Sequence, residues 1–159
     1  TFTMISSTSS TPTPFNGPKL KVTRQMLKRV KNKDDIDGRI NQSIKLFELI
    51  GTPGKNYDTP EFRKKMRAYI KRGGDDSGFL RQIAAIIGSK NRKDVLKSIK
   101  TPTLIIHGDV DPLINVNNAF KSNKLIDNSY LIIVEDMGHL LDLNSYNKFQ
   151  SDLIIFLKS

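Results

Sequence analysis

Two polar loops hold residues whose types could carry out chemistry together. The first is HGDVDPL at residues 107–113, which contains Asp111, and the second is EDMGH at residues 135–139, which ends in His139. A serine hydroxyl is a poor nucleophile at neutral pH and needs an imidazole to accept its proton. The imidazole in turn needs a carboxylate to fix its tautomer. The pair therefore predicts acyl transfer, with His139 as the base and Asp111 as the acid.

Each member of this pair also has a structural interpretation. Asp111 could serve only as a turn residue before Pro112, and a histidine that follows a strand is often structural. Two neighbours favour the catalytic interpretation, because Pro112 would stiffen the backbone beside the acid. Gly138 would allow the tight turn that presents His139.

Other polar residues lie near the pair in the sequence. Asp109 is the alternative acid, and Glu135 and Asp136 are expected in solvent. His107 comes at the predicted end of a strand, before Gly108, and is expected to be a packed, hydrogen-bonded histidine with no direct role.

The loops are positioned by alternating strands and helices. Residues 103–107 and 130–134 are apolar runs of the kind that is buried on both faces of a parallel sheet. Helical stretches are expected near 117–125 and over 146–157, which completes a βαβ alternation. In an open parallel sheet, the site lies beyond the carboxyl ends of the strands. Neighbouring strands are about 4.8 Å apart, so the two loops can meet there.

The rest of the chain divides by composition. Residues 1–7 are expected to form a strand, and residues 8–18 a loop, because they hold three prolines. Residues 19–100 have helical periodicity, with a stop signal at 51–54 and a start at Thr59, followed by Pro60. The expected helices lie near 22–30, 40–50, 60–73, 79–88 and 94–99.

Residues 101–113, TPTLIIHGDVDPL, resemble the strand and acid loop of the α/β-hydrolases, and residues 137–139 resemble their histidine loop. The likeness is greatest to the esterase branch typified by aclacinomycin methylesterase and to proline iminopeptidase-like hydrolases. It implies an α/β fold class: the C-terminal part of an α/β-hydrolase with a helical cap, without the N-terminal half of the sheet. Residues 1–18 would then be a core strand and loop, 19–100 the cap, and 101–159 the C-terminal core.

The family order along the chain is serine, acid, histidine, and the serine is not found here. No G-x-S-x-G sequence occurs; GDDSG at residues 74–78 places Ser77 one position late, and no buried strand precedes it. The resemblance therefore implies a fragment of a serine hydrolase for small ester or amide substrates. A separate N-terminal segment is its expected partner. The alternatives are an inactive remnant or half of a split enzyme. No cofactor or metal is implied.

The charge distribution raises one further alternative. The net charge is +10, and residues 19–100 hold 22 Lys and Arg against 9 Asp and Glu, while residues 101–159 hold 4 against 7. This excess could bind an anionic polymer, or it could coat solvated helix faces. Interleaved aromatic residues are missing, so nucleic acid is not the expected partner. There is no membrane-length apolar run. The absence of cysteine fits a cytoplasmic location, and a strand that begins at Thr1 suggests a fragment.

Overall fold

The computed structural model describes residues 1–10, 13, 17–28, 30, 32, 34–73 and 76–158, apart from the side chains of residues 76, 77 and 79. Part of the predicted loop at 8–18 lies outside the described residues. The elements are β1 (Phe2–Ile5), α1 (Leu20–Met26), α2 (Ile36–Ile50), α3 (Pro60–Lys71), α4 (Asp76–Gly88), α5 (Lys93–Ser98), β2 (Thr103–Gly108), α6 (Asn117–Leu125), β3 (Ser129–Val134) and α7 (Leu143–Lys158). The expected strands and helices are therefore present, with ends that differ by a few residues.

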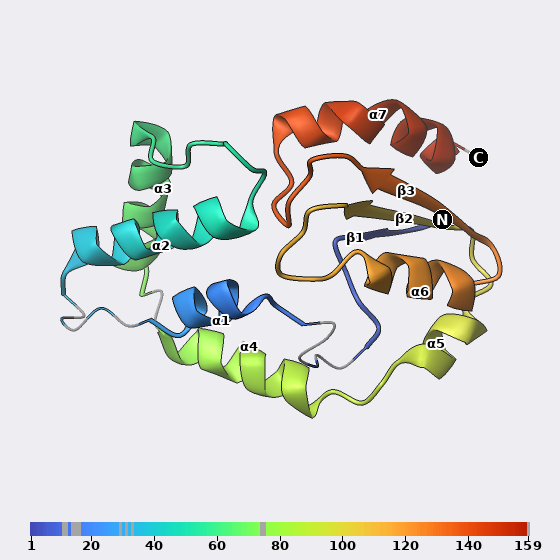
Figure 1. The fold of residues 1–159 in the computed structure, drawn as a ribbon, viewed down its shortest axis with the longest axis horizontal. Helices are drawn as coiled ribbons and strands as arrows, with labels where there is room; N and C mark the ends of the chain where they lie inside the picture. The colour runs from blue at the N-terminus through green and yellow to red at the C-terminus, as the bar shows by residue number, and fades with distance from the viewer. Residues whose placement is uncertain are drawn as a thin grey trace.

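The three strands form one parallel sheet in the order β1-β2-β3 (Figure 1). Phe2 pairs with Thr103 on one side of β2, and Thr103 pairs with Ser129 on the other. All six residues of β2 are buried, as their apolar run predicts for a central parallel strand. The sheet alternates with helices in the expected βαβ order.

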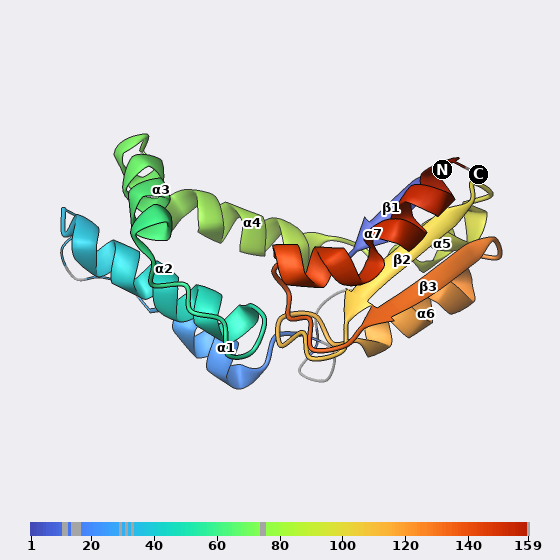
Figure 2. The same cartoon turned by 90° about the horizontal axis from the view of Figure 1, so that it is seen from above.

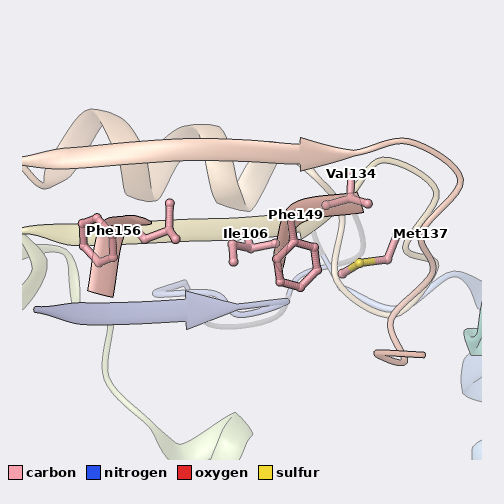
Figure 3. Packing of buried hydrophobic residues seen from close by; sticks show 6 residues of the cluster. Ile106, Val134, Met137, Phe149 and Phe156 are labelled. Carbon is pink, nitrogen blue, oxygen red and sulfur yellow. The ribbon is translucent and has the colours of Figure 1, made fainter. Parts of the chain in front are cut away.

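The core lies on both faces of the sheet. Alternate residues of β2 point to opposite faces, so Leu104 and Ile106 pack against α7 while Ile105 packs toward α5 and α6. Figure 3 shows Phe149 of α7 beside Ile106, with Phe156 further along the same face of the sheet. Helix α7 therefore covers one face of the sheet, and α5 and α6 cover the other (Figure 1).

Strand β3 differs from its expected burial. The apolar run at 130–134 predicts a strand buried on both faces, but β3 lies at the edge of the sheet and only Val134 is buried. Tyr130 is 61% exposed. The prediction was wrong because an apolar run reports on the two faces of a strand and says nothing of whether a further strand covers its edge.

Helices α1–α3 lie beyond the carboxyl ends of the strands, away from α5 and α6 (Figures 1 and 2). Helices α2 and α3 share a small core of their own, built on Ile40, Ile44 and Ile70. Thr59 starts α3 as predicted, because its side chain accepts a hydrogen bond from the Phe62 N–H at 3.2 Å. This second cluster gives the helices a packed body next to the sheet.

Helix α4 has an apolar face that the described residues do not cover. Leu80, Ile86 and Ile87 are 47%, 48% and 65% exposed. An exposed apolar face of this kind usually marks a contact surface. Among the described helices none is long and apolar enough to cross a bilayer.

Candidate active site

The two polar loops meet at the carboxyl ends of β2 and β3. His139 Nδ1 lies 2.9 Å from Asp111 Oδ2, which is within hydrogen-bonding distance. Glycine is needed at the start of the acid loop, because a Cβ on Gly108 would lie 1.9 Å from the Met137 carbonyl oxygen. The fold thus brings together the two residues that the sequence singled out.

The Asp111 carboxylate is fully buried, and donors surround it. Oδ1 accepts hydrogen bonds from the backbone N–H groups of Leu113 and Ile114, at 2.8 and 2.9 Å. Oδ2 faces the His139 ring, and the side chain of Asp111 is 0% exposed. Burying a carboxylate is costly unless such donors compensate it. The turn at 111–114 is therefore built around the charge of Asp111.

His139 is held from the other side by the end of helix α2. Its backbone N–H donates to the Ile50 carbonyl oxygen at 2.6 Å, and its side chain is 21% exposed. A Cβ on Gly138 would lie 2.1 Å from the Gly51 carbonyl oxygen. The histidine loop is therefore packed against the carboxyl end of α2 as well as against the acid loop.

The role of Gly138 differs from the predicted one. The only non-glycine residues with positive φ in the described part of the chain are Ser6 and Asp136, and Asp136, at φ 57°, makes the turn that leads to His139. Gly138 is not among the glycines with positive φ. Gly138 must be small because Gly51 approaches it closely. The tight turn is made instead by Asp136, which the sequence predicted only to lie in solvent.

Asp142 joins α7 to the segment that follows α2, a contact that sequence reasoning missed. Its Oδ1 caps α7 by accepting from the Ser145 N–H at 2.8 Å, and its Oδ2 lies 3.2 Å from Lys55 Nζ. Burial acts to raise the pKa of Asp142, but hydrogen bonds from Ser145, Thr52 and Lys55 outweigh it and lower the pKa to about 2. A capping pattern, D-x-x-S before an apolar helix, was the available signal.

The other polar residues that the sequence singled out differ in their exposure. Asp109 is exposed, so it does not replace Asp111 on the histidine. Glu135 and Asp136 are exposed as expected. His107 is fully buried and hydrogen-bonded, as expected. The side chain of Ser77 lies outside the described residues.

The geometry leaves one ring nitrogen of His139 for chemistry. A carboxylate only accepts hydrogen bonds, so Nδ1 carries a proton and Nε2 keeps a lone pair. Such a nitrogen can take a proton from a hydroxyl brought next to it. A cavity of about 500 Å³ lies between α1 and α2, lined by Leu20, Lys21, Arg24, Gln25, Lys28 and Leu49. Neither Asp111 nor His139 lines it.

Comparison with curated proteins gives a short match. The rat (Rattus norvegicus) protein ABHD14B is 33% identical over 60 residues, which cover 38% of this chain and 28% of that protein. No protein-family model matches the chain.

Solved structures match over most or nearly all of the chain. The meta-cleavage product hydrolase CumD from Pseudomonas fluorescens IP01 has a TM-score of 0.71 and 16% identity, over 98% of this chain and 54% of that one. The enol-lactonase from Burkholderia xenovorans LB400 has a TM-score of 0.69 and 15% identity, over 99% and 55%. A bromoperoxidase from Bacillus anthracis has a TM-score of 0.60 and 24% identity, over 78% and 45%. The chain spans about half the length of these solved structures, and at these identities the likeness is one of fold.

Proposed function

We propose, from the α/β-hydrolase fold that this chain has in part, that Asp111 and His139 are the acid and base of a serine hydrolase. The enzyme would cleave small carboxylic esters or amides through an acyl-serine intermediate. The observation that carries the proposal is the 2.9 Å contact between His139 Nδ1 and the buried Asp111 Oδ2 at the ends of adjacent strands. A buried carboxylate that orients an imidazole is the arrangement that activates a serine.

The serine is proposed to come from residues outside this sequence, as a strand and helix that extend the sheet. Strand β1 has β2 on one side and no described strand on the other. A parallel segment paired there would lie beside β1, and its carboxyl end would lie at the same edge of the sheet as those of β2 and β3. Its following turn could then present a serine toward His139 Nε2. His139 would take the hydroxyl proton and return it to the leaving group, while Asp111 stabilises the imidazolium.

Residues 19–100 are proposed to form the lid of this hydrolase. Helices α1–α3 lie past the strand ends (Figure 2), and Ile50 at the end of α2 accepts a hydrogen bond from the backbone of His139. Lids over such sites exclude water and select the substrate. The cavity between α1 and α2 lies in this segment.

The test is made on tagged protein expressed in its own source and purified with any chain that stays bound. Hydrolysis of p-nitrophenyl acetate and labelling by a fluorophosphonate are measured. His139→Ala is expected to lower kcat by roughly 10⁶-fold, while the control Asp136→Asn, on an exposed carboxylate of the same loop, leaves kcat unchanged. Unchanged turnover in His139→Ala would overturn the proposal. A solitary 18.0 kDa chain without turnover would favour an inactive remnant.

A second candidate function is supported by the charge on α1. Lys21, Arg24 and Lys28 line the cavity, and none of the three has an acidic partner in the part of the chain that the structure describes. A basic module for an anionic polymer would lose affinity steeply with salt. Binding of polyuridylate at low ionic strength, lost on exchanging these three residues for glutamine, would support this candidate, and no binding would dismiss it.

A further inference from the structure

His107 occupies a position that its predicted packing role leaves partly unexplained. It lies in β2, four residues before Asp111, and its side chain is 1% exposed. Its Nε2 lies 2.9 Å from the Ile114 carbonyl oxygen and 3.5 Å from Asp111 Oδ2. Both imidazoles of the sequence therefore face one carboxylate oxygen, one at each side.

The surroundings of His107 define its tautomer. A carbonyl oxygen and a carboxylate oxygen both accept hydrogen bonds, so the nitrogen that faces them, Nε2, carries a proton. Nδ1 is buried and has no hydrogen-bond partner among the described residues. Of the two neutral tautomers, the Nε2–H form is thus the one that fits the site, because it places the donor where the acceptors lie.

Ile114 connects the Nε2–H donor of His107 to the Asp111 carboxylate. The Ile114 N–H donates to Asp111 Oδ1 at 2.9 Å, and the Ile114 carbonyl accepts from His107. One residue thus links the two side chains, and the turn at 111–114 is closed against the end of β2. An apolar side chain at 107 would fill the space but would leave the Ile114 carbonyl without this donor.

We propose that His107 is a positioning residue for the triad acid, an inference that rests on the proposed function of Asp111 and His139. Its Nε2–H fixes the 111–114 turn, which keeps Asp111 Oδ2 directed at His139 Nδ1. With the carboxylate held, His139 keeps its proton on Nδ1 and its lone pair on Nε2. His107 touches no substrate and takes no part in proton transfer.

The test reads the tautomers of both histidines, so it needs no substrate and no nucleophile. The chain is labelled with ¹⁵N-histidine, and imidazole NMR spectra are recorded at neutral pH. The proposal requires His107 as the Nε2–H tautomer and His139 as the Nδ1–H tautomer. A wild-type spectrum with His107 protonated on Nδ1 would overturn it before any variant is made.

Three variants separate positioning from packing. His107→Gln carries an amide N–H near the place of Nε2 and is expected to keep His139 as Nδ1–H. His107→Leu lacks a donor, and about half of the His139 population is expected to move to the Nε2–H tautomer. Ile105→Val, which removes a buried methyl group from the same strand, should lower the urea midpoint without changing the tautomer.

The other possible results of these variants also test the proposal. If His107→Leu keeps the wild-type tautomer of His139, or if Ile105→Val changes it equally, His107 only packs and the proposal fails. If His107→Leu does not fold, His107→Met, which is unbranched and adapts to irregular space, takes its place. A His107-dependent tautomer together with an active His139→Ala enzyme would instead refute the proposed function and leave the positioning role standing.

Discussion

At the scale of single residues, the site depends on a charge that is buried and fully engaged. Asp111 has no exposed side-chain surface, and two backbone donors and His139 converge on it. The energetic consequence is asymmetric, because a donor left without its acceptor costs more than the hydrogen bond itself contributes.

Asp111→Ala is therefore expected to lower the free energy of unfolding by about 3 kcal/mol, since the N–H groups of Leu113 and Ile114 lose their acceptor. Urea unfolding followed by circular dichroism measures this. The exposed Asp109 is the matched control, and Asp109→Ala should stay within about 0.5 kcal/mol of the wild type. Equal losses in the two variants would contradict the burial argument.

Gly138 allows a second test at this scale. Gly138→Ala would place a Cβ 2.1 Å from the Gly51 carbonyl, so the histidine loop or the end of α2 must shift. We expect a loss of about 2 kcal/mol or more, as for overpacking elsewhere. Gly88→Ala, at the last residue of α4 with no atom within 4 Å, is the control and should be neutral or slightly stabilising. Urea midpoints of the two variants settle the comparison.

At the scale of elements, the amino end of α7 joins the lid segment to the sheet. Asp142 caps α7 and also forms an ion pair with Lys55 in the segment after α2. The same residue therefore supports the helix that covers one face of the sheet and the loop next to His139.

This contact predicts a pH dependence. The pKa of Asp142 is lowered to about 2 from 3.8, so its carboxylate stabilises the fold fully above about pH 4, and that stability is lost as the pH falls through about 2. The difference corresponds to about 2 kcal/mol. Asp142→Asn should be less stable than the wild type at pH 6 by this order, with the gap closing near pH 2. Asp152→Asn, at an exposed carboxylate of α7, is the control. A gap that is constant with pH would contradict the prediction.

At the scale of the whole molecule, the edge of β1 that faces away from β2 is the surface on which the proposed function depends. The N–H groups of Phe2 and Ser6 donate to the carbonyl oxygens of Pro102, just before β2, and Ile106, within β2. Because N–H groups alternate along a parallel strand, those of Thr3 and Ile5 point to the other edge.

Thr3→Pro should therefore weaken binding of the proposed nucleophile-bearing segment while leaving the ladder to β2 in place. Native mass spectrometry of tagged protein from its source measures the bound fraction, which we expect to fall at least tenfold. Met4→Pro, whose N–H faces β2 by the same alternation, should lower the urea midpoint of the chain itself. An unchanged bound fraction in Thr3→Pro would argue against pairing along β1.

The local features of this protein were predictable from its sequence. Periodicity located helices 117–125 and 146–157 closely, Thr59 and Pro60 marked the start of α3, and the apolar run at 103–107 located a strand that is buried along its whole length. The elements themselves predicted a βαβ alternation, and the resemblance of residues 101–113 and 137–139 implied the α/β-hydrolase fold, which is present in part and is shared with the solved structures. The pairing of Asp111 with His139 was predictable because parallel strands end at one edge.

Only the tertiary structure decided how the loops are held. Position 138 tolerates only glycine because Gly51 lies against it, and the Ile50 carbonyl accepts a hydrogen bond from the His139 backbone. Both histidines face the same oxygen of Asp111. The exposure of Tyr130 depends on which strands flank β3. The periodicity of apolar residues indicates the type of an element and which of its faces is buried. Contacts between segments far apart in the chain are fixed by how those elements pack, and no local pattern records that.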